Sequence, residues 1–215
     1  MTEKTAQKEP GKKPVPSKKP KPQQEVVVQI PLSELHPFPD HPFQVREDAS
    51  MQETAESVKE YGVLVPALAR PREDGGYELI AGHRRKHACE LAGLTTMPVI
   101  VRDIDRDAAT IIMVDSNLQR ENILPSERAK AYKMKMEAIK RQGARTDLTS
   151  PKISAKFRSD DEVGQDAGVS GDTIRNYIAL TQLVPELQQM VDEKKIALSP
   201  AYQIAALTHK KQGFL

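Results

Sequence analysis

The chain begins its patterned part with a short β-branched run and then shifts to helical periodicity. Val26–Ile30 has the composition of a strand, and Pro31–Leu35 turns away from it. Between Asp48 and Tyr61 the apolar positions recur at helical spacing. They are Met51, Ala55 and Val58. Either Asp48 or Ser50 can cap the start of this predicted helix, and Gly62 ends it.

Three more strands and two helices complete the predicted N-terminal half. Ala67–Arg70 and Tyr77–Ala81 flank Glu73-Asp74-Gly75-Gly76, which predicts a hairpin turn, and Met97–Val101 predicts a further strand. We expect helices over Asp107–Asn117 and over Ser126–Gln142, the second started by Pro125.

Strand-like patterns disappear after Pro151, and short helical patterns replace them. We expect these helices at about 152–158, 162–168, 170–183, 185–194 and 199–208, with a linker over Gly143–Ser150 and a turn over Arg158–Glu162. The fold class is therefore α+β, a small α/β domain followed by an all-helical domain. The predicted divisions are a disordered basic Lys/Pro tail at 1–24, the α/β domain at 25–125, a basic linking helix at 126–145 and the helical domain at 146–215.

Composition narrows the class of protein. The 215 residues are 38% hydrophobic, contain no Trp, and include one cysteine, so the chain has no internal disulfide and no multi-cysteine metal site. We expect Cys89 to be a small packed residue of a helix rather than a nucleophile. No run approaches the roughly 20 apolar residues of a membrane span, and the N-terminus lacks the apolar core of a secretion signal, so we expect a cytoplasmic protein.

The net charge of +2 hides an uneven distribution. Residues 1–24 hold seven lysines and two glutamates, and residues 126–145 hold seven basic and two acidic side chains. The tail is either a solubilising arm or a tether for DNA phosphates or a partner protein. The 126–145 helix either presents a solvated face or contacts DNA. By contrast, residues 146–215 hold eight basic and nine acidic side chains.

The segment from Val163 to Ile178 has the pattern of a helix-turn-helix. A small Ala167, Gly168 at the turn and a capping Ser170 precede a second helix with apolar residues at helical spacing. The exposed positions early in that helix are then the candidate DNA contacts. They are Ser170, Asp172, Thr173, Arg175 and Asn176. An ordinary helical hairpin makes similar demands on glycine and apolar spacing, and the acidic balance of the domain favours that alternative.

The stretch Gly82-His83-Arg84-Arg85-Lys86-His87-Ala88 joins a hydrophobic strand to an amphipathic helix. Glycine lets the backbone approach a ligand, a helix start offers unpaired N–H groups, and two arginines supply forked donors. This combination is suited to phosphate. The alternative is a strand-to-helix turn whose arginines pair with nearby carboxylates.

Several blocks in this order resemble the ParB family of DNA partition proteins. They are Leu32-Ser33-Glu34-Leu35, Pro42-Phe43-Gln44-Val45-Arg46, Tyr61-Gly62-Val63-Leu64-Val65-Pro66, the Gly82 loop and Asp115 to Glu127, followed by the helix-turn-helix. The resemblance runs from about Val26 to Leu207. It implies a ParB/sulfiredoxin-like N-terminal domain and a protein of plasmid or mobile-element type that acts in chromosome or plasmid partition.

The resemblance further implies that CTP and Mg²⁺ bind the first domain and that the nucleotide drives closure of a dimer into a clamp on double-stranded DNA. By position, the nucleotide-binding residues are Gly62, Val63, Gly82, His83, Arg84, Arg85, Asn117 and Arg120, with Asn117 as the Mg²⁺ ligand. A ParA-type ATPase is a further partner that the family implies, and we expect no membrane partner.

The chain departs from the family at two positions. His83 and Ser116 stand where the family usually has glutamate, so whether the chain is a slow CTPase stays open, and no catalytic residue is assigned. Asp115 is one position away from the second site, which on a helix turns its side chain by about 100°. His83 either donates a hydrogen bond to phosphate or only shapes the loop. A zinc site at His83 and His87 lacks a third ligand.

Two other functions compete with the partition hypothesis. The first is a nucleotide-independent helix-turn-helix transcriptional regulator that uses its first domain for dimerisation. The second is an enzyme of the sulfiredoxin type, which the absence of a cysteine in the Gly82 loop disfavours. The sequence does not specify the DNA site, and family members carry a further C-terminal dimerisation segment that is not obvious before Leu215.

Overall fold

The computed structural model describes residues 25–120, 122–147 and 159–213. Its N-terminal part contains a five-stranded mixed sheet in the order β1-β5-β3-β4-β2. The strands are β1 Val27–Pro31, β2 Leu35–Pro37, β3 Ala67–Pro71, β4 Tyr77–Ala81 and β5 Thr96–Val101. β1 pairs antiparallel with β5 and β3 with β4, whereas β3/β5 and β2/β4 are parallel. The predicted strands and the hairpin are confirmed; β2 was missed because three residues ending in proline carry no periodicity.

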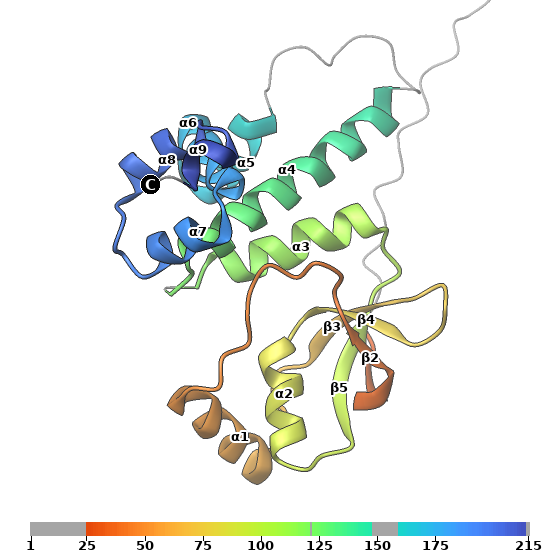
Figure 1. Cartoon of the computed structure of the whole chain (residues 1–215). Helices are drawn as coiled ribbons and strands as arrows, with labels where there is room; N and C mark the ends of the chain where they lie inside the picture. Colours follow the sequence, from red (N-terminus) through yellow and green to blue (C-terminus); the bar gives the residue numbers. More distant parts are fainter. Residues whose placement is uncertain (1–24, 121, 148–158, 214–215) are drawn as a thin grey trace, which may run out of the picture.

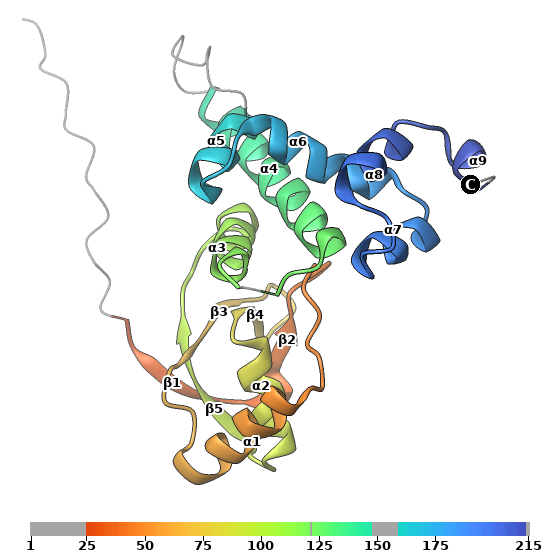
Figure 2. The same ribbon diagram turned by 90° about the vertical axis from the view of Figure 1, so that its left-hand side faces the viewer.

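Both faces of the sheet are covered by helices (Figure 1). Leu79 and Ile80 are adjacent in β4 and point to opposite faces, as strand geometry requires. Leu79 packs in a core with α1 (Ala49–Tyr61) and α2 (His83–Leu91), and Ile80 packs against α3 (Arg106–Leu118). Figure 2 shows α3 between the sheet and the long helix α4 (Pro125–Asp147). The sheet therefore holds the start of α2 and the end of α3 in fixed positions.

Local capping explains where the first helices begin and end. The Asp48 carboxylate accepts a hydrogen bond from the Met51 backbone N–H at 2.9 Å, so Asp48 rather than Ser50 caps α1. Gly62 ends α1 with a φ of 72°. Cys89 is fully buried in the first core, and burial raises the pKa of its thiol, as does the nearby Glu90. Cys89 is therefore the packed residue that the sequence predicted.

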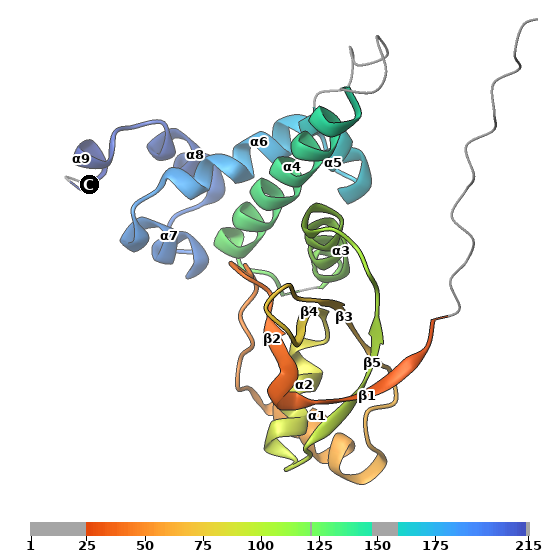
Figure 3. The same ribbon diagram turned by 90° about the vertical axis from the view of Figure 1, so that its right-hand side faces the viewer.

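Helix α4 joins the two halves of the molecule. It packs against α3 on one side and against the helical C-terminal part on the other, as Figure 3 also shows. Ala131 lies in the core with α3, whereas Ala129 and Tyr132 lie in cores with the C-terminal helices. The predicted linker from Gly143 is wrong over 143–147, since α4 continues to Asp147. Helix propagation adds a hydrogen bond per residue, and one glycine costs only about 1 kcal/mol.

The C-terminal part consists of short helices. They are α5 Ser159–Ala167, α6 Gly171–Ala179, a 3-10 turn Leu180–Gln182, α7 Pro185–Asp192, α8 Leu198–Ala205 and α9 His209–Gln212. The predicted turn over Arg158–Glu162 is wrong for its described residues, because the acidic residues Asp160 to Glu162 form the first turn of α5, where negative charge is favourable. The predicted helix 152–158, the residues 148–150 of the predicted linker and the tail 1–24 lie outside the described residues. Within the described ranges, no helix is both long and apolar enough to span a membrane.

Candidate functional site

The first candidate site is the start of α2. Gly82 precedes the helix with a φ of 110°, in the left-handed region, and no side chain caps the helix. The free N–H groups of the first turn therefore remain available for a ligand or solvent. His83, Arg84 and Arg85 occupy this turn, so the strand-to-helix junction predicted from the sequence is confirmed.

Three arginines from separate segments line one cleft beside this helix start. The cleft has a volume of about 560 Å³ and contains Arg46 from the loop before α1, Arg84 from α2 and Arg120 from the turn after α3. Its other lining residues are Phe43, Gln44, Asp48, Ser50, Gln119, Asn122, Ile123 and Glu127. Burial lowers the pKa of Arg120, and the positive charge of Arg84 lowers it further. An anion in the cleft would relieve this crowding of like charges.

Two carboxylates offset part of that charge. Glu127 is buried and accepts hydrogen bonds from the backbone N–H groups of Gln44 at 3.0 Å and Leu124 at 3.1 Å. Oε2 of Glu127 lies 3.9 Å from Nη2 of Arg46. Asp48 lies 3.5 Å from Arg84. The sequence did not identify Arg46 or Glu127 as site residues. Both lie in blocks that resemble the ParB family, but only the fold brings those blocks together.

Arg85 has a different position from Arg84. Its guanidinium donates hydrogen bonds to the carbonyls of Val65 at 2.5 Å and Pro66 at 2.6 Å. It thereby ties the loop after α1 to the start of α2. Gly62 ends α1, and Val63 packs against the core of that domain. Neither these two residues nor Arg85 line the arginine cleft.

Asn117 is buried near the end of α3. Its Nδ2 donates hydrogen bonds to the Met113 carbonyl at 2.7 Å and to the Ser116 hydroxyl at 3.3 Å. Because a carbonyl can only accept, these contacts assign the other atom as Oδ1. This oxygen is inaccessible to water and has no hydrogen-bond partner among the described residues. Asn117 therefore has an oxygen free for a ligand but does not line the cleft.

The two neighbours of Asn117 on its N-terminal side are engaged elsewhere. The Ser116 hydroxyl donates a hydrogen bond to the Met113 carbonyl at 2.9 Å. The Asp115 carboxylate lies 2.6 Å from the ammonium of Lys135 on α4. Asp115 is thus not a free carboxylate that replaces the missing glutamate.

His83, the first residue of α2, packs against a second histidine, His41. The ring centroids of His41 and His83 are 4.0 Å apart, and the His41 Nδ1 donates to the Phe43 carbonyl at 2.7 Å. Burial, together with the charges of His41, Arg120 and Lys86, lowers the pKa of His83 to about 3. His83 is therefore neutral at neutral pH. The described residues contain no group of three or more histidine, cysteine or acidic side chains placed to hold a metal ion, so His83 and His87 lack a third ligand of these types there.

The neutral His83 predicts a pH dependence of stability. The unfolded chain takes up a proton at His83 near pH 6.5, whereas the folded chain does so only near pH 3. More protons are bound to the unfolded state in this window, so stability falls as pH falls through it. Between pH 7 and 4, we expect the free energy of unfolding of His83→Gln to fall less steeply with falling pH than that of the parent. The difference between the two slopes should correspond to close to one proton. Urea unfolding at several pH values measures this slope; equal slopes for the two proteins would contradict the prediction.

The second candidate site is the corner between α5 and α6. Gly168 turns the chain with a φ of 68°, and the Ser170 hydroxyl caps α6 by accepting from the Thr173 backbone N–H at 3.2 Å. Val163 and Ile174 are buried together with Tyr132 of α4. The two helices predicted to form the helix-turn-helix are therefore present and packed.

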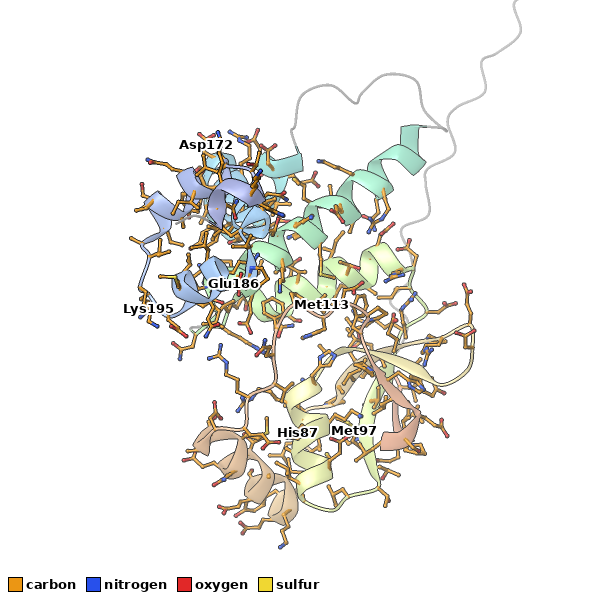
Figure 4. All side chains as sticks on the ribbon, in the orientation of Figure 1. His87, Met97, Met113, Asp172, Glu186 and Lys195 are labelled. Atoms are coloured by element: carbon orange, nitrogen blue, oxygen red, sulfur yellow. The ribbon has the colours of Figure 1, made fainter. Side chains whose placement is uncertain are left out.

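The predicted DNA-contacting residues lie on the outer side of this corner. Asp172, Arg175 and Asn176 are exposed, and Thr173 is half-buried. Figure 4 shows Asp172 at the outer end of the helical part, far from His87 on α2. The guanidinium of Arg175 is paired with Asp160 at the start of α5 and with Asp172. Both carboxylates compete with any DNA group for Arg175.

The basic residues of α4 do not form one free face. Lys135 is buried, Arg141 lies 2.7 Å from Asp107 of α3, and Arg128 lies over the ring of Tyr177 at 5.6 Å. Lys130 and Lys140 are exposed. The positive charge counted in the sequence therefore serves partly to join α4 to its neighbours.

Comparison with known proteins identifies a family model for each half of the chain. The model of the ParB N-terminal domain matches residues 16–118, and the model of the ParB HTH domain matches residues 151–214. The chromosome-partitioning protein Spo0J of Thermus thermophilus is 35% identical over 182 residues, which cover 84% of this chain and 60% of that protein. The chain thus spans about 60% of the length of this curated relative.

Two crystal structures of a C-terminally truncated ParB from Caulobacter crescentus also match. The one complexed to the centromeric parS site has a TM-score of 0.54 and 27% identity, covering 87% of this chain and 93% of that one. The one complexed with CTP-gamma-S has a TM-score of 0.41 and 28% identity, covering 86% and 94%.

Proposed function

The chain belongs to the ParB family, and from this premise we propose that it is a partition protein that binds a specific double-stranded DNA site and uses CTP to control its self-association on DNA. The observation that carries the nucleotide half of the proposal is the convergence of Arg46, Arg84 and Arg120 on one cleft at the start of a helix. Arginine forks and helix N–H groups together are the donors that a triphosphate requires.

In this proposal Asn117 would hold Mg²⁺. Asn117 has a buried Oδ1 without a partner among the described residues, and oxygen is the ligand type that Mg²⁺ selects. Asp48 supplies a carboxylate in the cleft wall. When bound, the ion would neutralise phosphate charge. Because Oδ1 is inaccessible to water, a cation reaches it only after the end of α3 moves.

The DNA half of the proposal rests on the helix-turn-helix and on the parS complex of the Caulobacter relative. In this chain α6 enters the major groove, and Ser170, Thr173 and Asn176 face DNA with Arg175. Arg175 first has to exchange Asp172 or Asp160 for a DNA group. The clamp, dimerisation and a ParA-type ATPase partner extend the same proposal, with action at the nucleoid or a plasmid.

The test is equilibrium binding of the four ribonucleoside triphosphates with Mg²⁺ to the parent, Arg84→Ala and Arg72→Ala. Loss of a charge-assisted hydrogen bond of about 1.5–3 kcal/mol predicts that Arg84→Ala weakens CTP binding by roughly 10- to 150-fold. Arg72 is the matched control, because it pairs with exposed Asp74 in the β3–β4 hairpin, outside the cleft.

The result separates the two leading functions. Selective CTP binding that is lost in Arg84→Ala and kept in Arg72→Ala supports the nucleotide-controlled protein. A folded chain that binds parS DNA but no nucleotide supports instead the nucleotide-independent regulator that uses its first domain for dimerisation. Phosphate release in the same samples shows whether a chain with His83 and Ser116 hydrolyses CTP.

A further inference from the structure

A buried lysine connects three helices that meet between the two candidate sites. Lys135 of α4 is 1% exposed, and its Nζ lies 2.6 Å from Asp115 of α3 and 2.9 Å from Asp166 of α5. Burial alone would lower the pKa of Lys135, but the two carboxylates raise it above its ordinary value. The ammonium therefore remains charged and needs at least one carboxylate.

Each carboxylate lies on a helix that leads to a different candidate site. Asp115 precedes Asn117 by two residues, on the helix that leads into Arg120 of the cleft. Asp166 lies in the last turn of α5, immediately before the turn into α6. One side chain thus contacts both the helix that ends at the arginine cleft and the first helix of the helix-turn-helix.

Both apolar packing and ion pairs join α5 to α3. A hollow of about 450 Å³ lies beside the ion pairs. Its lining residues are Asp115, Leu118, Gln119, Arg128, Tyr132, Asp166, Ala167 and Val169. The apolar contact between α3 and α5 involves α4, where Tyr132 packs with Val163 of α5 and Leu118 of α3. Lys135 pairs with two residues of that lining, Asp115 of α3 and Asp166 of α5, and these ion pairs add directional contacts to the packing.

We propose that Lys135 is a positioning residue that holds the helix-turn-helix in register with the end of α3, so that nucleotide binding in the arginine cleft alters the DNA-reading helix through Asp115, Lys135 and Asp166. This inference rests on the proposed function for its nucleotide step. The positioning step does not depend on nucleotide. A shift of Asp115 leaves the buried ammonium on Asp166 alone, which frees α5 from α3 without leaving the charge unpaired.

The positioning step is tested by a distance measurement on the whole chain without ligand. Spin labels are placed at exposed Leu91 on α2 and exposed Met190 on α7, as Leu91→Cys and Met190→Cys, while Cys89 stays unlabelled because it is buried. The variants are Lys135→Met, Asp115→Asn and Asp166→Asn, and the control is Lys130→Met, which changes an exposed lysine of the same helix. Asp115 and Asp166 are about half exposed, so their amide variants keep the fold even where Lys135→Met does not.

We expect a broader label-to-label distance distribution for Asp115→Asn and Asp166→Asn than for the parent and Lys130→Met. Unchanged distributions in both amide variants would overturn the inference, whatever nucleotide does. In the second arm, the Kd for a parS duplex is measured with and without Mg²⁺–CTP. Coupling between two sites is typically about 5- to 150-fold, and we expect the parent's factor to fall toward 1 in the amide variants. A parental factor retained in them, with CTP binding verified, would also overturn it.

Discussion

Replacing Gly164 by alanine is expected to disrupt the α5–α6 corner and abolish specific DNA binding. A Cβ at this position would lie 2.6 Å from the Val169 carbonyl oxygen and 3.1 Å from the Gly171 backbone nitrogen. These are backbone atoms of the turn, so no side-chain rotation relieves the contact. The turn has to open, and the start of α6 moves with it.

The expected sign is opposite to that of an ordinary helical glycine. In a free helix interior, Gly→Ala stabilises by about 1 kcal/mol. Overpacking against a fixed backbone costs about 1–3 kcal/mol and occasionally more, so the net effect here is destabilising. Thermal unfolding and hydrogen exchange measure it: we expect amides of α5 and α6 to lose protection while those of α1 and α2 keep theirs.

Gly213 provides the matched control for Gly164. A Cβ at Gly213 meets no described atom closer than 3.7 Å, so Gly213→Ala should leave both unfolding and DNA affinity nearly unchanged. If Gly164→Ala behaves like Gly213→Ala, the α5–α6 corner in solution is not packed tightly against Gly164.

The main elements of the fold were predictable because each carries its own local signal. Asp48 caps α1 and Ser170 caps α6 through their own side chains, and the pattern of the hairpin from β3 to β4 is contained in fifteen residues. By contrast, β2 exists only because β4 offers it a parallel partner. A three-residue strand has no periodicity of its own, so its prediction requires the fold.

The candidate sites were predictable as segments but not as contacts. Arg84 and Arg85 are neighbours in sequence, yet one lines the cleft and the other holds the carbonyls of Val65 and Pro66. A helix turns by about 100° per residue, so adjacent side chains meet different surroundings. The sequence likewise identifies Lys135 only as one of several basic residues, because its burial depends on Asp115 and Asp166 arriving from two other helices.

The second large effect is expected at Gly82, where alanine should destabilise the N-terminal domain by about 2–5 kcal/mol. Left-handed backbone costs an L-residue about 1–2 kcal/mol, and overpacking adds about 1–3 kcal/mol. Gly82 has a φ of 110°, and an added Cβ would lie 2.8 Å from the Cβ of Ala67 in β3. The sequence suggested that this glycine admits a ligand; the close neighbour in the structure is a strand of the protein itself.

Two further variants separate the backbone cost from the contact. Gly75 has a φ of 90° with no described atom within 4 Å of an added Cβ, so Gly75→Ala measures the cost of a positive φ without a steric contact. Ala67→Gly removes the opposing methyl group, so Gly82→Ala should cost less in that background than in the parent. Urea unfolding of the four proteins of this cycle gives the coupling energy. Coupling near zero would mean that only the backbone conformation requires glycine at position 82. The contact with Ala67 would then contribute little to holding α2, and with it Arg84, over β3.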